Sequence, residues 1–204
     1  MSLQTKTYTQ LYTLVKALYG VTSLTTEEDT LLGAFINRRL YNAYRRSDLW
    51  PRYLVVGEAR VASSNVIPFT QTTLNTIDTF LRVYSASPYD TQSVDEFDFN
   101  VTSSGARVVG NSSDASTFYV DYKKVWDGPF DATSNTLIPL EHFEYAAHGA
   151  YADMLRYDKQ QDKAMLADQE AEQLLVLELA NPMLQRTAQV AGRRIRTYNT
   201  KQSR

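Results

Sequence analysis

The chain has two histidines, and both lie in one segment with acidic neighbours, so this segment is the first candidate for chemistry. His142 lies beside Glu141 and close to Glu144, and His148 follows six residues later. A helical metal pair needs ligands three or four residues apart, because only then do both side chains share a face. Six residues correspond to about 600° of helical rotation, so the two rings point to opposite sides. We therefore expect two histidines at a helix surface or interface, with no bound metal or other cofactor.

Other sequence signatures of catalysis are absent from the chain. It contains no cysteine, which excludes thiol catalysis, disulfides and cysteine-based metal sites. It has neither a phosphate-binding glycine loop nor a nucleophile-elbow motif. Paired carboxylates occur in "VDEFDF", but no basic or histidine residue accompanies them, which is typical of a solvated loop. We expect a protein that is not an enzyme; an enzyme of an unrecognised type is the alternative that a deep pocket would favour.

A cluster of arginines and aromatic residues forms the next candidate site, in the segment "NRRLYNAYRRSDLW". Such residues could contact nucleic-acid phosphates, or bind a protein through cation–π contacts and salt bridges, or simply form a solvated helix face. We expect Trp50 to be a core anchor that closes this helix. The residues of this candidate interface helix are Arg38, Arg39, Arg45, Arg46 and Trp50.

Composition limits the classes of protein to which the chain can belong. Its 204 residues, 43% of them hydrophobic, suit one domain or two small ones with a real core. The net charge of −2 gives no overall basicity that would indicate a nucleic-acid-binding protein. Fourteen tyrosines suit half-buried surfaces such as protein interfaces. The sequence predicts neither a signal peptide nor a transmembrane helix, and so no membrane partner.

Helical periodicity marks the first part of the chain. Apolar residues at helical spacing predict a short helix that ends near Gly20, a residue suited to a C-terminal cap. A second helix should begin at Thr25, which has capping-box spacing to Glu28, and run to about Ser47. Pro51 then disfavours further helix.

From Tyr53 to about Asp131 the pattern changes to short β-branched and aromatic runs separated by turn residues. This spacing predicts an antiparallel sheet or small barrel. One strand, "TFYVDYKKVW", alternates well between two faces. Phe118, Val120 and Tyr122 belong to one face, and Tyr119, Asp121 and Lys123 to the other.

Helix returns near Pro139, and the alanine-rich sequence that follows predicts a closely packed helical hairpin ending at Asn181-Pro182. The predicted fold class is therefore α+β: a bundle of N- and C-terminal helices, with an inserted antiparallel β module and an extended tail. The predicted segments are 1–52 (N-terminal helices), 53–137 (β module), 138–182 (helical hairpin) and 183–204 (basic tail).

The tail differs from the rest of the chain in its charge. Nine acids lie between Glu141 and Glu178, whereas no acid follows Glu178 and six cations do. The tail has too few large apolar residues to build a core, so we expect it to be disordered until it binds a partner. The candidate docking residues are Arg186, Arg193, Arg194, Ile195, Arg196, Tyr198, Lys201 and Arg204.

The whole pattern resembles the head-to-tail adaptor (connector) proteins of tailed bacteriophages. Three stretches carry the resemblance: "LYNAYRRSDLWPRY" before the strands, "FYVDYKKVWDGPFD" at the end of the β insertion, and the proline-initiated, alanine-rich "LIPLEHFEYAAHGAYADMLRYDKQQDKAMLADQEAEQLL". The resemblance covers most of the chain and rests on layout more than on one motif. It includes no catalytic residue.

The resemblance implies an architectural role. Such adaptors form a ring, usually of twelve copies, beneath the portal of a DNA-filled head, and they present a platform to the tail or nozzle protein. The packaged DNA passes through the channel without sequence-specific binding, and the basic C-terminal segment docks on the portal. The expected location is the virion neck, after synthesis in the host cytoplasm. The alternative is an accessory nucleic-acid-binding protein that uses the arginine-rich helix and the basic tail.

Overall fold

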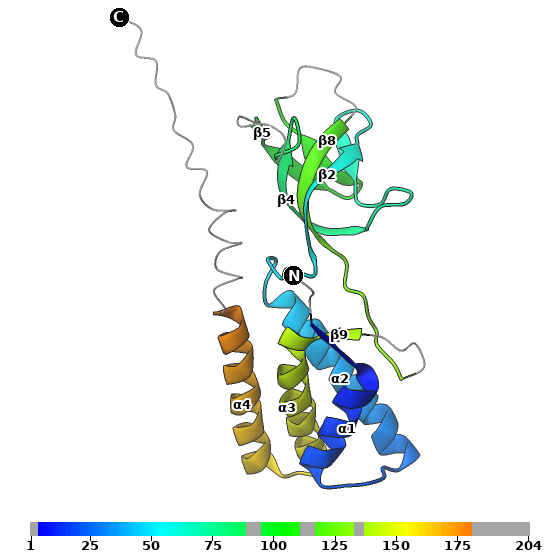
Figure 1. Cartoon of the computed structure of the whole chain (residues 1–204), viewed down its shortest axis with the longest axis vertical. Coiled ribbons are helices and arrows are strands. Elements are labelled where there is room, and N and C mark those ends of the chain that lie inside the picture. The colour runs from blue at the N-terminus through cyan, green and yellow to red at the C-terminus, as the bar shows by residue number, and fades with distance from the viewer. Residues whose placement is uncertain (1–3, 89–94, 111–116, 133–136, 181–204) are drawn as a thin grey trace, which may run out of the picture.

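The computed structural model describes residues 4–88, 95–110, 117–132 and 137–180, and it shows a helical bundle that carries a β module at one end (Figure 1). The bundle is made of α1 (Tyr8–Tyr19), α2 (Thr26–Arg45), α3 (Leu140–Tyr157) and α4 (Gln161–Leu179). The predicted α+β class and the placement of the β segment between two helical parts are confirmed. The end of the hairpin at Asn181-Pro182 lies outside the described residues.

The first helix ends and the second begins at the signals read from the sequence, and α2 ends at Arg45, two residues before the expected Ser47. Thr25 and Glu28 form the predicted capping box of α2, and Gly20 caps α1 with φ 78°, a left-handed conformation that glycine adopts without steric cost. Residues 5–7 differ from the expected helix. Thr5–Thr7 is a strand, β1, which pairs antiparallel with β9 (Leu137–Pro139) and so ties the two helical parts together.

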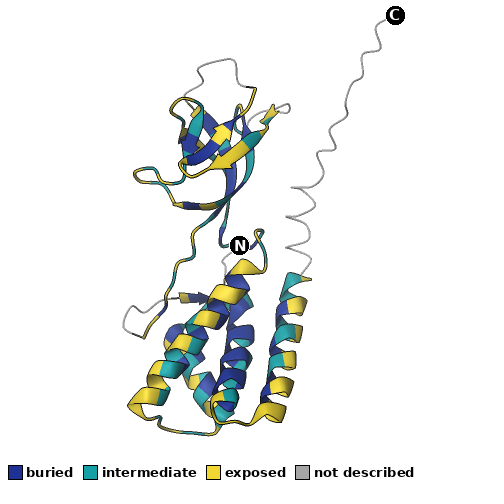
Figure 2. Ribbon diagram, turned by 180° about the vertical axis from the view of Figure 1, so that it is seen from behind, coloured by how far each residue is buried: buried dark blue, intermediate teal, exposed yellow. Residues whose placement is uncertain are grey.

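α3 is the central helix of the bundle, and its alanines are buried against neighbours on more than one side (Figure 2). Ala146, Ala147 and Ala150 pack in the core shared with α1 and α2. Ala152 packs instead with Ala164 and others of α4. Because alanine has a short side chain, helix axes can approach closely on both sides of α3. The closely packed helical hairpin expected from the sequence is confirmed.

The β module consists of two antiparallel sheets around one apolar core. In one sheet the order is β2 (Leu54–Val61), β8 (Thr117–Lys124), β4 (Ile77–Tyr84) and β5 (Glu96–Phe97). In the other it is β3 (Val66–Pro68), β7 (Gly105–Val108) and β6 (Phe99–Thr102). These strands lie within the predicted β segment, and their antiparallel pairing is as expected.

The two faces of β8 have different roles. Phe118, Val120 and Tyr122 belong to the module core, as their alternation suggests. On the other face, the charged Asp121 and Lys123 are also buried, at 8% and 2% exposure. Asp121 accepts hydrogen bonds from the Gly57 backbone amide and from the Tyr84 hydroxyl, while Lys123 contacts the bundle.

Lys123 joins the module to the end of α2. Its Nζ donates to the Tyr44 carbonyl at 2.9 Å and to Asp48 at 3.0 Å, and it lies 3.9 Å from the centre of the Tyr44 ring. The Tyr44 hydroxyl in turn donates to Asp78 of β4 and to the carbonyl of Lys124. A lysine is well placed here, because a helix C-terminus carries partial negative charge. The module is therefore fixed to the bundle by polar contacts at this junction.

Candidate functional site: an arginine network between the helices

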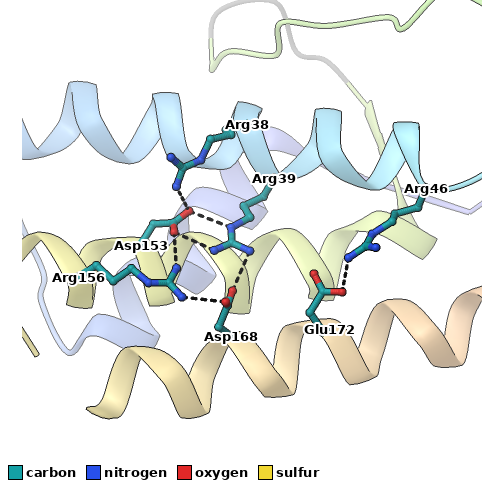
Figure 3. A network of polar contacts seen from close by, with 7 residues as sticks. All are labelled: Arg38, Arg39, Arg46, Asp153, Arg156, Asp168 and Glu172. Carbon is teal, nitrogen blue, oxygen red and sulfur yellow. Dashed lines mark hydrogen bonds and ion pairs between the residues drawn. The ribbon is translucent and has the colours of Figure 1, made fainter. Parts of the chain in front are cut away.

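The arginine-rich segment of α2 faces two carboxylates of the C-terminal helices (Figure 3). Arg39 donates through Nε and Nη2 to the two oxygens of Asp153 on α3, both at 2.8 Å. Its Nη1 forms an ion pair with Asp168 on α4, also at 2.8 Å. The side chain of Arg39 is 9% exposed and that of Asp153 is 2% exposed, so the pair is shielded from water. One guanidinium thus joins α2, α3 and α4.

A glycine on α3 makes room for this guanidinium. A Cβ at Gly149 would lie 2.7 Å from Arg39 Cδ and 3.0 Å from its Nε, closer than side chains tolerate. Glycine inside a helix costs about 0.5–1 kcal/mol relative to alanine. The alanine-rich sequence of α3 therefore contains a glycine where Arg39 crosses it.

Arg39, Asp153 and Asp168 stabilise one another's charged forms. Burial alone would lower the pKa of Arg39, but Asp153 and Asp168 outweigh it and raise that pKa above its usual value. Burial likewise favours the protonated form of both acids, yet their arginine partners hold the pKa of each below its usual value. All three groups are therefore charged at neutral pH.

Three more arginines extend the network toward solvent. Arg38 Nη2 lies 2.6 Å from Asp153, and Arg156 bridges Asp153 at 2.9 Å and Asp168 at 2.7 Å. Further along the same groove, Arg46 pairs with Glu172 of α4. Four arginines thus face three carboxylates, which leaves this surface with net positive charge.

The network borders an open pocket of about 340 Å³ between α2, α3 and α4. Arginines dominate its lining, with one carboxylate and one phenol. Such a lining can bind an anion, but it holds no general base beside a nucleophile. Within the described ranges, no group of three or more histidine, cysteine, aspartate or glutamate side chains could hold a metal ion. The lining residues are Arg39, Asn42, Arg45, Arg46, Tyr145 and Glu172.

The structure separates the arginines that the sequence grouped together. Arg39 is buried, so a solvated helix face is the wrong interpretation for it. Arg38, Arg45 and Arg46 are exposed, and the Arg45 guanidinium lies 5.9 Å from the Tyr41 ring centre. Whether they form an interface with a partner stays a prediction.

Trp50 is a core residue, as expected from the sequence. It is fully buried, and its indole nitrogen donates to the Ala43 carbonyl at 2.9 Å. It therefore fixes the segment that follows α2 against the helix end.

The two histidines have different environments, and the surface assignment is wrong for His142. That residue is 1% exposed, and its ring lies 4.6 Å from Trp50 and 6.1 Å from Tyr53. Burial, together with nearby Arg52 and Lys123, lowers the pKa of His142 to about 3, so the ring is neutral. His148 is partly exposed, and its Nδ1 lies 3.3 Å from Glu170.

Sequence reasoning missed the acidic half of the network. Asp153 and Arg156 are three residues apart on one helix, a spacing that favours an ion pair. Nothing in the spacing connects Arg39 to Asp153 or Asp168, which are more than a hundred residues away in the chain. The candidate tail residues 186–204 lie outside the described residues.

Comparison with known proteins gives no relative for this chain: no family model, curated protein or solved structure matches it. In the described part of the chain, no helix is long and apolar enough to cross a membrane.

Proposed function

We propose that this protein is a structural head-to-tail adaptor of a tailed bacteriophage, assembled as a ring between portal and tail. The observation that carries the proposal is the exposed apolar surface of α4. Met165, Leu166, Val176 and Leu177 are 55, 64, 59 and 68% exposed, although the opposite side of α4 already packs in the bundle. Met165 and Leu166 form one pair near the start of α4, and Val176 and Leu177 form another near its end. Large apolar side chains exposed at both ends of one helix face are typical of a protein-contact surface.

The architecture suits an assembly role in two further ways. The buried network ties three helices together, so the bundle can behave as one stiff unit. The β module lies beyond one end of the bundle, where it can reach a different partner (Figure 1). The proposed partners are the portal protein, a tail or nozzle protein, and further copies of the chain, twelve in the resembled family. DNA would pass through the channel without sequence-specific contacts, in the neck of the virion. No catalytic role is proposed.

The basic tail is the proposed portal-docking segment. Its six cations and absence of acids suit an acidic groove, where arginine can pair bidentately with carboxylates. Charge alone gives little specificity, so Ile195 and Tyr198 would serve as apolar anchors.

Deletion of residues 186–204 tests this docking. Purified, DNA-free portal rings of the phage that encodes the chain are immobilised, and binding of full-length and truncated protein is compared. We expect truncation to abolish binding. A second variant, with Ile195 and Tyr198 changed to serine, retains every charge and separates anchoring from electrostatics. Wild-type affinity of the truncated protein for these rings would refute docking through the tail, and failure of the full-length chain to bind them would refute the adaptor role.

The alternative, nucleic-acid binding, is less well supported by the bundle. Arg38, Arg39 and Arg46 are engaged by carboxylates, so they are less available to phosphates. Arg45, which is exposed, and the tail are the remaining candidates. Duplex DNA binding by the full chain that falls steeply with salt, and is lost on truncation, would favour this alternative.

A further inference from the structure

Between Met165 and Leu177 the exposed side chains of α4 are uncharged except for Glu170, which is unusual for a helix at the edge of a bundle. The inward face holds Ala164, Ala167, Ala171 and Leu175, all buried. The opposite side exposes uncharged side chains at three- to four-residue intervals, and on the same side lie two charged residues, Asp162 near the start of the helix and Glu170 near its middle. We call this surface the α4 ridge; it consists of Leu166, Gln169, Gln173, Val176 and Leu177.

A second exposed surface lies on the far side of α3. In the projection of Figure 2, α3 lies between α2 and α4, and each of the two packs mainly on α3, while Arg39 and Arg46 also link α2 to α4 by ion pairs. The outer residues of α2 are Ala34, Arg38, Tyr41 and Arg45, all exposed. We call these four residues the α2 ridge.

The two ridges are complementary in charge. Arg45 contacts the Tyr41 ring, and no carboxylate within the described residues lies in ion-pair range of it. Glu170, at the edge of the α4 ridge, has a 61% exposed side chain, and its described ionic contact is the imidazole of His148. An arginine on one ridge and a glutamate on the other are thus open to a further partner, while Tyr41 offers apolar surface at 41% exposure.

The heights of the two ridges along the bundle also match. α2 and α4 both run toward the β module (Figure 1), and each advances about 1.5 Å per residue. The pairs Arg39–Asp168 and Arg46–Glu172 show which residues are level within one chain. By these two pairs Glu170 is level with residues 41–44, and Gln169 with residues 40–43. A rotation about an axis along the helices leaves height unchanged. Arg45 lies one residue, about 1.5 Å, beyond this range, which its long side chain spans, so Glu170 of one copy would reach Arg45 of the next.

We infer that the α4 ridge of one copy packs against the α2 ridge of a second copy of this chain, with Glu170 beside Arg45. The inference rests on the proposed adaptor function, and it names the surfaces by which the copies meet. Two different surfaces form this contact, so it is heterologous. Repeating such a contact builds a ring when the rotation closes, whereas a self-complementary patch would stop at a dimer.

Disulfide cross-linking tests the pairing directly, because the chain contains no cysteine. Two single variants are prepared, Gln169→Cys on α4 and Tyr41→Cys on α2, and are oxidised alone and mixed, both free at high concentration and on portal rings. We expect cross-linked dimers from the mixture and little from either variant alone. Because Tyr41→Cys removes the ring contacts of Tyr41, Asn42→Cys is prepared as a second α2 variant that keeps them. Val101→Cys, 61% exposed on β6, is the matched control and should not cross-link above background.

Several outcomes overturn the inference. Cross-links of Gln169→Cys with itself alone would show a self-complementary contact, and absence of cross-links both free and on the portal would show that the ridges do not meet. If the full chain binds the portal while the mixture fails to cross-link, the adaptor function stands and this interface falls. If the full chain does not bind the portal, the proposed function itself fails.

Charge exchange gives an independent test. Glu170→Arg and Arg45→Glu should each lower the association constant between copies about tenfold or more, measured by sedimentation. The double variant, which restores opposite charges across the contact, should recover most of the loss. If both single variants associate like the unmodified chain, or if the double variant is as weak as either one, the proposed register is wrong.

Discussion

At the residue scale, Arg39 illustrates how a buried charge can fix helix packing without adding much net stability. Taking a guanidinium and a carboxylate out of water costs several kcal/mol per ion, and their attraction offsets this cost when the geometry is good. Arg39 meets the condition, since both nitrogens that face Asp153 are at 2.8 Å. The benefit is specificity of placement: α2 can take one position against α3 and α4, because sliding would leave the charges unpaired.

Alanine at Gly149 should therefore destabilise the protein, although alanine favours helix. The new Cβ would lie 2.7 Å from Arg39 Cδ, and Arg39 is held at its far end by two carboxylates. We expect a loss of about 1–3 kcal/mol in the free energy of unfolding, measured by urea denaturation. Gly33→Ala on α2 is the matched control, because its nearest contact is 3.4 Å away, and it should be neutral or slightly stabilising. Equal stabilisation by both substitutions would show that the Arg39 side chain moves aside without any loss of unfolding free energy.

Because His142 is buried, the free energy of unfolding should depend on pH in the mildly acidic range. Its pKa is about 3 in the folded chain, against 6.5 for an unperturbed histidine, so between these values the unfolded state binds one more proton. The contribution is fully present above pH 6.5 and is lost as pH falls toward 3. Between pH 7 and pH 5 we expect unfolding free energy to fall by about 2 kcal/mol from this group.

The variant His142→Phe removes this titration, so its stability should change less over the same pH interval in urea denaturation. His148→Gln serves as the control, because that ring is partly exposed and should leave the pH dependence nearly unchanged. A pH profile that is identical in the unmodified chain and in His142→Phe would contradict the assignment of a neutral, buried ring.

At the scale of elements, the junction between α2 and β8 shows how a strand can be anchored to a helix end. Lys123 is 2% exposed and reaches the Tyr44 carbonyl, one of the last carbonyls of α2 that no helical amide satisfies. The same residue pairs with Asp48 in the segment after the helix. The contact thus replaces water at a helix terminus with a cation from another element.

Replacement of Lys123 by methionine, which has similar length, should cost about 2 kcal/mol of unfolding free energy, because a buried carbonyl and a carboxylate lose their partner. Urea denaturation measures the loss. Lys124→Met is the matched control: the neighbouring lysine is more exposed and pairs with nearby Asp127, so its loss should cost less than about 1 kcal/mol. Equal effects of the two substitutions would indicate that the junction contributes no more than a surface pair.

At the scale of the whole molecule, the bundle and the β module have separate apolar cores joined at one place. The module enters and leaves the bundle through adjacent strands, since Leu54 pairs with Lys123 and Val55 with Tyr122. The bundle core draws on α1, α2 and α3, and includes Phe130 from the return connection. These features suggest that the bundle does not need the module in order to fold.

Replacing residues 56–121 by Asn-Gly, a sequence suited to a two-residue hairpin turn, should leave the bundle folded. The shortened chain should keep its helical circular dichroism signal and unfold cooperatively. Loss of helix in this variant, with full-length protein as the control, would show that the module core supports the bundle.

The sequence by itself determined the local features of this protein. Capping residues fix where α1 ends and α2 begins, two periodicities separate the helical parts from the β segment, and the alanines of α3 mark close packing. Each of these signals acts over a few residues, so it can be read without knowing the fold. The burial of Trp50 follows in the same way, from a large ring at a helix end.

Tertiary structure alone decided which charges meet. Arg39 joins Asp153 and Asp168 across more than a hundred residues, His142 lies buried beside Trp50, and Lys123 reaches the end of α2. None of these pairings has a local signature, because charge and ring types at one position say nothing about what a distant element brings to it. The physical reason is burial. On an isolated helix Arg39 would be a solvated surface residue. Once α3 and α4 cover it, Arg39 becomes the centre of the network that positions the helices.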